Sequence, residues 1–215
     1  MGRVAGVTSA ETRARLLRAA ADVFAARGYD GTRVADIATA AGVSNGALYA
    51  HFGSKAELLV ASLRAHGGRV LADLLAADPS QPVTDLLLQA GRCLPRQRDD
   101  RSYLIVEALI AARRSEEVAG PMREYTSERA GWLAGLVRAG QARGEIDPAL
   151  PPDALAHFCL LLSLGSSLLT PDLRAVDEAE WSALLVRVVS ALSPVQVRET
   201  EIAHDRTQEP NGCAP

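Results

Sequence analysis

The chain has 215 residues, of which 48% are hydrophobic and only 4% are aromatic. This length suits one large domain, or a small domain fused to a larger one, with a core built mainly from leucine, alanine and valine. A net charge of −3 argues against a generally basic nucleic-acid-binding protein. Residues 1–15 lack the apolar stretch of a signal peptide, and the longest apolar run, within residues 158–169, is too short for a membrane span. We therefore expect a cytoplasmic protein.

The composition and spacing predict helices in chain order. Alanine, leucine, arginine and glutamate favour helix, and no alternating run of β-branched residues indicates a strand, so the predicted fold class is all-α. A first helix is expected after a cap at Thr8 or Ser9, and Gly28 ends it. Residues 32–41 are predicted to form a second, short helix and residues 44–50 a third, with a glycine turn between them.

Ser54 is expected to cap a fourth helix, because Glu57 follows it at the spacing of a capping box. This helix is predicted to continue into residues 71–78, with a weak point or kink at Gly67 and Gly68. A proline-containing break follows. Further helices are predicted at 83–97, 101–114, 122–143, 152–169 and 178–192.

Three cysteines, Cys93, Cys159 and Cys213, are odd in number and lack metal-ligand spacing, so reduced thiols are expected. The sequence also lacks GxSxG and HExxH motifs, a phosphate-binding loop, and a cysteine–histidine pair with an orienting residue. We therefore expect no metal site, no cofactor and no catalytic residues. A catalytic group assembled from residues far apart in the sequence is the alternative.

Basic residues gather near the N-terminus. Residues 1–64 carry eight lysine or arginine side chains and five acidic ones, which gives this segment a net charge of +3 in a chain of −3. A basic N-terminal segment followed by an acidic remainder is expected when only the N-terminal segment binds a polyanion. Chance is the alternative, and the motif within the segment decides between them.

Residues 32–50 read as a helix, a glycine turn and a second helix that is too short to be stable alone. Val43, Leu48 and Phe52 are placed to pack on the preceding helices, which leaves small polar residues facing outward. Small outward residues let a recognition helix approach base edges in the major groove of DNA. The residues predicted to face outward are Ser44, Asn45, Ala47, Tyr49 and His51.

Lys55 is the only lysine of the chain and falls in the first turn of the fourth helix. A cation there opposes the helix macrodipole by roughly a few tenths of a kcal/mol or more, so it needs a compensating partner. A DNA phosphate would pair with the ammonium and with the free N–H groups of the helix end. The alternative is a solvated lysine loosely paired with Glu57 or Asp36.

The segment AAADVFAARGYDGTRVADIATAAGVSNGALYAHFGSKAELL, residues 19–59, resembles the N-terminal DNA-binding domain of the TetR family of transcriptional regulators. The resemblance covers the whole of that domain and includes FAARGYDGT, IATAAGVS, GALYAHF and SKAELL. The rest of the chain is similar only in kind, as a divergent helical domain that binds a small molecule and dimerises. ARGEIDPALPPDALA also resembles a segment that often precedes the dimer helices of the family.

The resemblance implies roles in DNA binding for a set of positions. Phosphate contacts would come from Thr32, Arg33, Tyr49, His51 and Lys55, and base contacts from Ser44, Asn45 and Ala47, with Gly46 allowing close approach. Many relatives have a basic residue at the position of Asn45, and often one at the position of Ala35. Because Ala35 is neutral here and Arg33 is basic, the phosphate contact is expected to have moved to Arg33. Two alternatives stay open: the Tyr49 ring packs the motif with only its hydroxyl outside, and Ser44 caps its own helix.

The helices predicted at 152–169 and 178–192 suit a dimer interface. The first carries Gly165, Ser166 and Ser167 beside leucines, and the second is amphipathic. The resemblance implies a four-helix interface in a homodimer, and an ordinary core within one chain is the alternative. A two-fold dimer would require a roughly palindromic operator.

The resemblance also implies a pocket for a small, largely apolar effector. Glu107 is the sharpest candidate to line it, because it interrupts the apolar run YLIVEALIAA and a buried carboxylate must be paired or neutral. It either binds a polar group of the effector or pairs with an arginine or a helix end. The other candidates, for which plain core packing is the alternative, are Leu71, Leu75, Leu87, Cys93, Tyr103, Trp132, Leu136 and Phe158.

The predicted organisation is a helix-turn-helix DNA-binding domain at 1–54 with an arm at 1–8, a helical effector-binding and dimerisation domain at 55–195, and a disordered tail at 196–215. The predicted function is a dimeric repressor that binds a palindromic operator and is released by an effector. An activator or co-regulator that acts through a protein partner is the alternative, and an enzyme is a more distant one.

Overall fold

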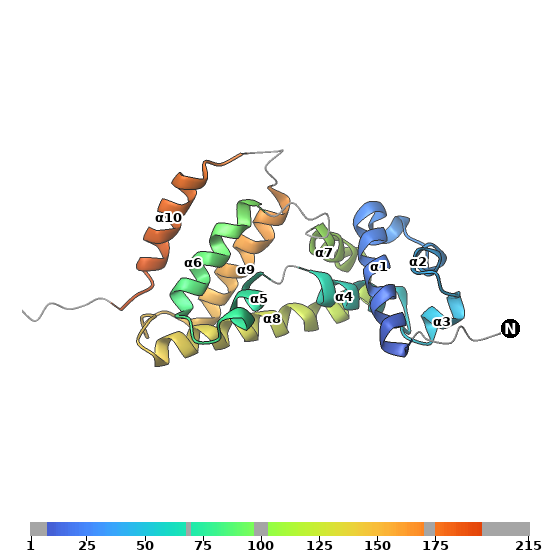
Figure 1. The fold of residues 1–215 in the computed structure, drawn as a ribbon, viewed down its shortest axis with the longest axis horizontal. Helices are drawn as coiled ribbons and strands as arrows, with labels where there is room; N and C mark the ends of the chain where they lie inside the picture. The colour runs from blue at the N-terminus through green and yellow to red at the C-terminus, as the bar shows by residue number, and fades with distance from the viewer. Residues whose placement is uncertain (1–7, 68–69, 97–102, 170–174, 195–215) are drawn as a thin grey trace, which may run out of the picture.

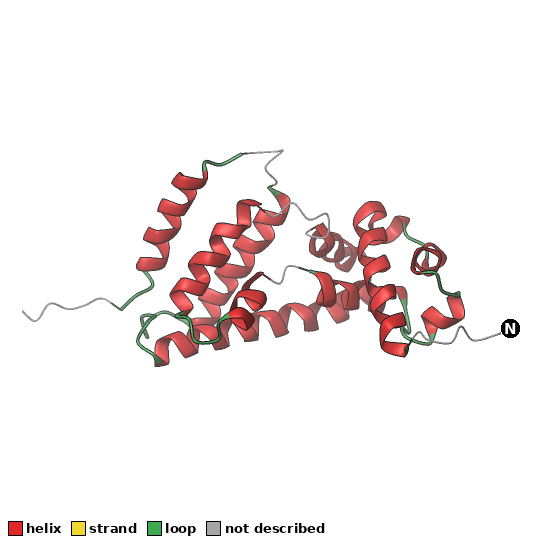
Figure 2. Ribbon diagram, in the orientation of Figure 1, coloured by secondary structure: helices red, strands yellow, loops and turns green. Residues whose placement is uncertain are grey.

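The computed structural model describes residues 8–67, 70–96, 103–169 and 175–194. Every regular element in these ranges is helical, so the all-α prediction is confirmed (Figure 2). The predicted tail, and the arm apart from Thr8, lie outside the described residues. The helices are α1 Ser9–Gly31, α2 Val34–Ala41, α3 Asn45–Tyr49, α4 Lys55–His66, α5 Val70–Ala77, α6 Val83–Cys93, α7 Leu104–Arg114, α8 Glu116–Ala142, α9 Pro152–Leu168 and α10 Glu178–Ser190, with a 3-10 turn at Leu94–Arg96.

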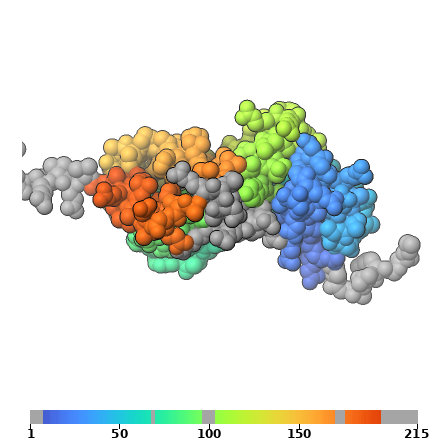
Figure 3. Space-filling model, turned by 90° about the horizontal axis from the view of Figure 1, so that it is seen from above, coloured from blue at the N-terminus to red at the C-terminus, as the bar shows by residue number. Residues whose placement is uncertain are grey.

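The molecule is elongated, and its N-terminal helices form one end (Figures 1 and 3). α1, α2 and α3 gather at this end, and α4 joins them to the rest of the chain. The long helix α8 runs along the body, where it packs against α4, α7 and α9. α10 lies at the opposite end and packs on α6. The N-terminal helices are therefore well separated from α10.

One hydrophobic core joins the N-terminal helices to the body. Phe24 of α1, Ile37 of α2, Leu48 of α3 and Leu59 of α4 are fully buried in it, and so is Val118 of α8. Each such side chain contributes about 1.5–3 kcal/mol when it leaves water. Because the core continues past residue 54, the domain boundary placed there stays a prediction.

α1 begins with a cap that the sequence predicted. Thr8 Oγ1 accepts the N–H of Glu11 at 3.2 Å, and the Glu11 carboxylate accepts the N–H of Thr8 at 2.7 Å, which makes a capping box. The backbone N–H and the hydroxyl of Thr8 both donate to the Glu11 carboxylate, and these bonds hold the pKa of that carboxyl below its usual value. Gly28, the predicted end of the helix, breaks the helical geometry with a φ of 70°, although a last turn follows it to Gly31.

Two helices end well before their predicted ends, by more than two residues. α4 ends at His66 because Gly67 takes an extended backbone, with φ −67° and ψ 153°, so α5 is a separate helix and not a continuation. α6 ends at Cys93, and a 3-10 turn containing Pro95 follows. A proline lacks the N–H that an α-helix needs and disfavours helical geometry in the residue before it. α4 is consequently a short element between the N-terminal helices and the body.

α8 begins earlier than predicted. The sequence indicated a break over residues 115–121, but α8 starts at Glu116 and contains Pro121. Pro121 removes one hydrogen bond from the second turn of the helix. Burial of Val118 and Met122 in the main core offsets that cost, so packing outweighs the local signal of the proline.

Gly140, near the end of α8, marks a close contact in a second, smaller core. A Cβ at this position would lie 2.9 Å from Ile146 Cδ1 and 3.2 Å from Val83 Cβ. Gly140→Ala is therefore expected to lower the free energy of unfolding by about 1–3 kcal/mol, as overpacking does. Gly131 of the same helix has open space around it, so Gly131→Ala is expected to raise stability by about 0.5–1 kcal/mol. Urea denaturation measures both changes, and changes of the same sign would contradict this packing.

Candidate nucleic-acid interface

α2 and α3 form a helix-turn-helix whose turn depends on glycine. Gly42 has a φ of 64° and a ψ of 39°, a left-handed conformation that costs glycine little. Its N–H donates to the carbonyls of Ala38 and Thr39, and the N–H of Val43 donates to Ala38 O at 2.9 Å. These bonds close the end of α2 and start the chain towards α3, as the spacing in the sequence predicted.

α3 is anchored through one side of its surface. Leu48 is fully buried, and Phe52, just beyond the helix, is 1% exposed. Ser44 Oγ accepts the N–H of Ala47 at 3.1 Å, so Ser44 caps the helix. Because a helix of 5 residues is not stable by itself, its orientation depends on this anchoring and on the turn before it.

The other side of α3 faces solvent. Ser44, Asn45 and Gly46 are exposed, and Ala47 is half-buried. Tyr49 keeps 54% of its surface exposed, which favours the outward-facing interpretation over the one in which its ring packs the motif. This face has no charged side chain of its own. It can therefore approach a partner surface closely, as base contacts in a major groove require.

The two residues before α2, Thr32 and Arg33, differ in whether their side chains are free to reach DNA. Thr32 is 2% exposed, and its Oγ1 donates to Gly28 O at 2.6 Å, so the hydroxyl stabilises the end of α1. Arg33 is exposed, and its backbone N–H donates to Asp36 Oδ2 at 3.3 Å. Asp36 in turn pairs with Arg27 at 3.0 Å. Of the two predicted phosphate contacts, Arg33 is the one whose side chain extends from the surface.

Lys55 has partners inside the chain that the sequence did not predict. Its Nζ donates to Tyr29 O at 2.9 Å and to Thr32 O at 3.2 Å, and it lies 4.1 Å from the centroid of the Tyr29 ring. Burial raises the pKa of the Tyr29 phenol above its usual value. Glu57, the alternative ion-pair partner of Lys55, instead accepts the N–H of Gly53 at 2.7 Å. The carbonyls at the end of α1 thus compensate the cation at the start of α4, and the phosphate contact of Lys55 stays a prediction.

Two arginines of α1 also contact this motif, and neither contact was predicted from the sequence. Arg15 Nη2 donates to Ala41 O at 2.5 Å. Arg13 Nη1 donates to the carbonyl of the half-buried His51 at 3.3 Å, and its guanidinium lies 4.5 Å from the Phe52 ring centroid. The acceptors are backbone carbonyls 26 and 38 positions away. No local pattern could therefore reveal the contacts.

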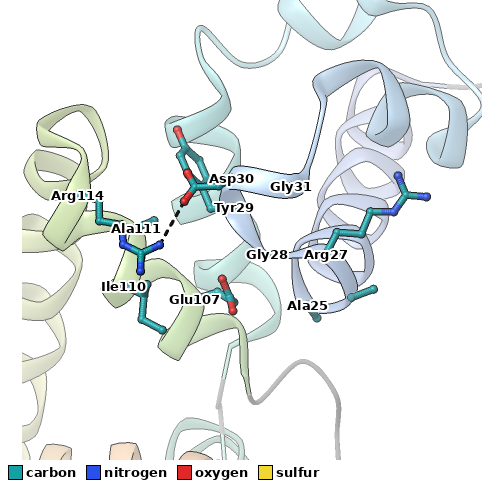
Figure 4. Close-up of a pocket in the computed structure, with 11 residues that line it drawn as sticks. Ala25, Arg27, Gly28, Tyr29, Asp30, Gly31, Glu107, Ile110, Ala111 and Arg114 are labelled. Atoms are coloured by element: carbon teal, nitrogen blue, oxygen red, sulfur yellow. Dashed lines mark hydrogen bonds and ion pairs between the residues drawn. The ribbon is translucent and has the colours of Figure 1, made fainter.

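α1 and α7 meet around an open hollow of about 370 Å³ (Figure 4). Glu107 Oε2 lies 3.0 Å from the place of a Cβ on Gly28, and Arg114 pairs with Asp30 at 3.5 Å. Glu107 is half-buried and faces the end of α1. Of the positions predicted to line an effector pocket, the hollow includes Glu107 and none of the others.

The other predicted effector-pocket residues are spread over several helices. Leu71 packs against a small core around Leu133, whereas Leu87 packs against a different one around Val137. The structure does not bring these two side chains into one cluster, and the effector pocket stays a prediction. Leu75, Cys93 and Leu136 are half-buried, and Tyr103, Trp132 and Phe158 are exposed.

In the ranges that the structure describes, no helix is long and apolar enough to cross a bilayer. The same ranges hold no group of three or more histidine, cysteine or acidic side chains placed to bind a metal ion. Cys93 and Cys159 are free thiols, and burial raises the pKa of Cys159.

Comparisons with known proteins agree with this geometry. The family model for bacterial regulatory proteins of the tetR family matches residues 16–62, from α1 into α4. The HTH-type transcriptional regulator ArpR of Pseudomonas putida is 36% identical over 181 residues, covering 75% of this chain and 82% of ArpR. The HTH-type transcriptional repressor NicS of Pseudomonas putida is 31% identical over 143 residues, covering 62% of this chain and 65% of NicS.

The solved structures show the same architecture. A TetR-family transcriptional regulator from Rhodococcus sp. superposes with a TM-score of 0.73 and 27% identity, covering 86% of this chain and 99% of that one. The relationship to ArpR extends over most of both chains, and the family model matches the residues that form the helix-turn-helix. The chain therefore belongs to the TetR family of bacterial transcriptional regulators.

Proposed function

We propose that this transcriptional regulator is a repressor that binds a palindromic operator as a homodimer and leaves it when a small effector binds. The observation that carries the proposal is α3, whose apolar side is buried at Leu48 while its polar side is exposed at Asn45. TetR-family membership makes the chain a regulator and not an enzyme. The repressor NicS supports repression as the sign of regulation. We place the protein in the cytoplasm, where a bacterial regulator of this family meets DNA.

The exposed side of α3 is proposed to read bases in the major groove. Ser44, Asn45 and Ala47 approach base edges, and Gly46 leaves room for the approach. Asparagine can form two hydrogen bonds with adenine. Phosphate contacts are assigned to Arg33, Tyr49 and His51, whereas Thr32 and Lys55 support the surface through their bonds to the end of α1.

A homodimer is supported by the exposed apolar face of α9. Phe158 is 45% exposed, Leu161 54% and Leu168 47%, and they recur at helical spacing. Gly165, within the same stripe, has open space around it. On α10, Leu184 is 53% exposed, although the opposite side of that helix packs on α6. A contiguous apolar stripe of this kind marks an interaction surface, and a second copy of the chain offers a matching one.

Leu161→Asp is expected to convert the homodimer to a monomer, because it places a charge in the middle of this stripe. Ile110→Asp on α7 is the matched control, since Ile110 is 41% exposed and lies outside α9 and α10. Sedimentation velocity at micromolar concentration distinguishes the states. A dimeric Leu161→Asp variant, or equal dissociation of both variants, would contradict the assignment of the interface.

α4 is proposed to carry the effector signal to the DNA-binding surface. Lys55, its first residue, binds the end of α1, and Arg64, in its last turn, pairs with Glu128 of α8. Leu59, between them, is fully buried in the shared core. A shift of α8 would therefore move α4 and the helices that it supports. The effector must bind the DNA-incompetent conformation more tightly than the competent one, or no release follows.

Transcription in vitro tests repression. The template carries a promoter that overlaps the operator selected by the purified protein. Repression predicts that the transcript decreases as wild-type protein is added and that the Leu161→Asp variant has a weaker effect. An increase in transcript would show an activator instead, which is the alternative reading of the same helix-turn-helix.

A further inference from the structure

The carboxyl ends of α1, α2 and α3 each receive a cationic side chain. Lys55 binds the end of α1, Arg13 binds the carbonyl just past α3, and Arg15 Nη2 donates at 2.5 Å to Ala41 O, the last residue of α2. The last carbonyls of a helix lack partners within the helix and carry the negative end of its dipole. A cation there is favourable and fixes the position of the helix end.

We propose that Arg15 is a positioning residue for operator recognition and acts on α3 through the turn before it. Arg15 Nη2 lies 3.5 Å from Gly42 O, and a Cβ on Gly42 would lie 2.8 Å from the same nitrogen. The guanidinium therefore rests directly against the turn between α2 and α3. This inference rests on the proposed function, because it gives Arg15 a part in reading the operator.

The structure around Arg15 explains why its contact with the turn would affect the position of α3. Leu16, the neighbour of Arg15 in α1, is fully buried, so the arginine extends from a fixed point in the core. α3 starts 3 residues after Gly42 and is itself only 5 residues long. Residues that read bases need to be held within roughly 0.5 Å of their working geometry. A turn that loses the Arg15 contact would let α3 shift while Leu48 keeps it attached.

Direct contact between Arg15 and a phosphate is the competing explanation, because the residue is exposed. The two roles differ in what they affect. Loss of a phosphate contact weakens binding to every sequence and reduces the salt dependence of affinity by about one unit of slope. Loss of a positioning residue weakens binding to the operator more than to random DNA and leaves the slope unchanged.

The test compares Arg15→Gln with Arg18→Gln, which removes the same charge from an exposed position of the same helix. The carbonyls of Ala41 and Gly42 accept from Arg15, one turn away from Arg18 on the same helix. Dissociation constants are measured for the selected operator and for a random duplex over a series of salt concentrations. Arg15→Gln is expected to lose about tenfold on the operator and less than twofold on the random duplex. Its salt slope should equal that of Arg18→Gln.

Gly42→Ala is the second variant, and it keeps every charge while its methyl group displaces the Arg15 guanidinium and the φ of 64° at this position strains the turn itself. It should lose operator preference with an unchanged salt slope. The double variant should lose less than the product of the two single losses, because both remove one contact. If Arg15→Gln lost equal affinity for both duplexes and had a lower salt slope, Arg15 would contact a phosphate. If its affinity for both duplexes were unchanged, Arg15 would have no role in DNA binding. A wild-type protein without operator preference would overturn the proposed function itself.

Discussion

Leu48→Ala is expected to lower the free energy of unfolding by about 2–5 kcal/mol, through lost burial and the cavity left behind. Leu48 is fully buried and is the buried residue of α3. A typical domain has only about 5–15 kcal/mol of stability in total. α3 depends on this contact, so operator binding should be lost before the whole chain unfolds.

Tyr49→Ala is the control for this prediction, because Tyr49 is the next residue of the same helix and is 54% exposed. Its free energy of unfolding should change by no more than about 0.5 kcal/mol. Its affinity should fall by a similar factor for operator and random DNA, as a phosphate contact requires. Chemical denaturation and fluorescence anisotropy measure the two quantities. If Leu48→Ala kept full stability, the burial that holds α3 in place would be wrong.

Asn45→Ala is expected to reduce the preference for the operator over random DNA by about 1–3 kcal/mol, the usual worth of a good base contact. Asn45 is exposed in the first turn of α3, where alanine favours helix and disturbs no packing. Stability should therefore be unchanged. Selection from a randomised duplex pool should show relaxed preference at a single position of each half-site.

Arg33→Ala is the matched control for Asn45→Ala. Arg33 is exposed before α2 and is assigned to the DNA backbone. Its loss should weaken binding to all sequences about equally and reduce the salt slope by about one. If Arg33→Ala changed the sequence preference and Asn45→Ala did not, the assignment of the two residues would have to be exchanged.

The helix-turn-helix could be predicted because its determinants are local. Gly42 supplies the left-handed turn, Ser44 caps α3, and Leu48 supplies the buried side, and all three fall within a few residues of one another. The capping box at Thr8 and Glu11 is local in the same way. Spacing alone identifies such features, since each partner is within one helical turn.

The use of the basic residues could not be predicted, because their partners are distant in sequence. The net charge of residues 1–64 suggested a surface made for a polyanion. In the structure, Arg13, Arg15 and Lys55 bind backbone carbonyls, and Arg27 pairs with Asp36. Much of that positive charge therefore acts within the fold. Net charge counts side chains but does not show which of them face outward.

Long-range packing also explains why the start of α8 was missed and why the sequence left two roles open for Glu107. Pro121 is a local signal against helix, but Val118 and Met122 are buried in the main core and keep that turn helical. Glu107 interrupts an apolar run, yet it is half-buried and faces Gly28 of α1. Both outcomes depend on which helix packs against which, and the sequence pattern of one helix does not contain that information.

Selection of genomic DNA fragments by the purified protein at near-physiological salt tests whether α3 reads a DNA sequence. Enrichment of one site with two-fold symmetry is expected, protected over two half-sites about one helical turn or a multiple of it apart. Asn45→Ala is expected to enrich a related site with relaxed preference. Salt-sensitive binding without any preferred sequence would contradict the assignment of α3 as a recognition helix.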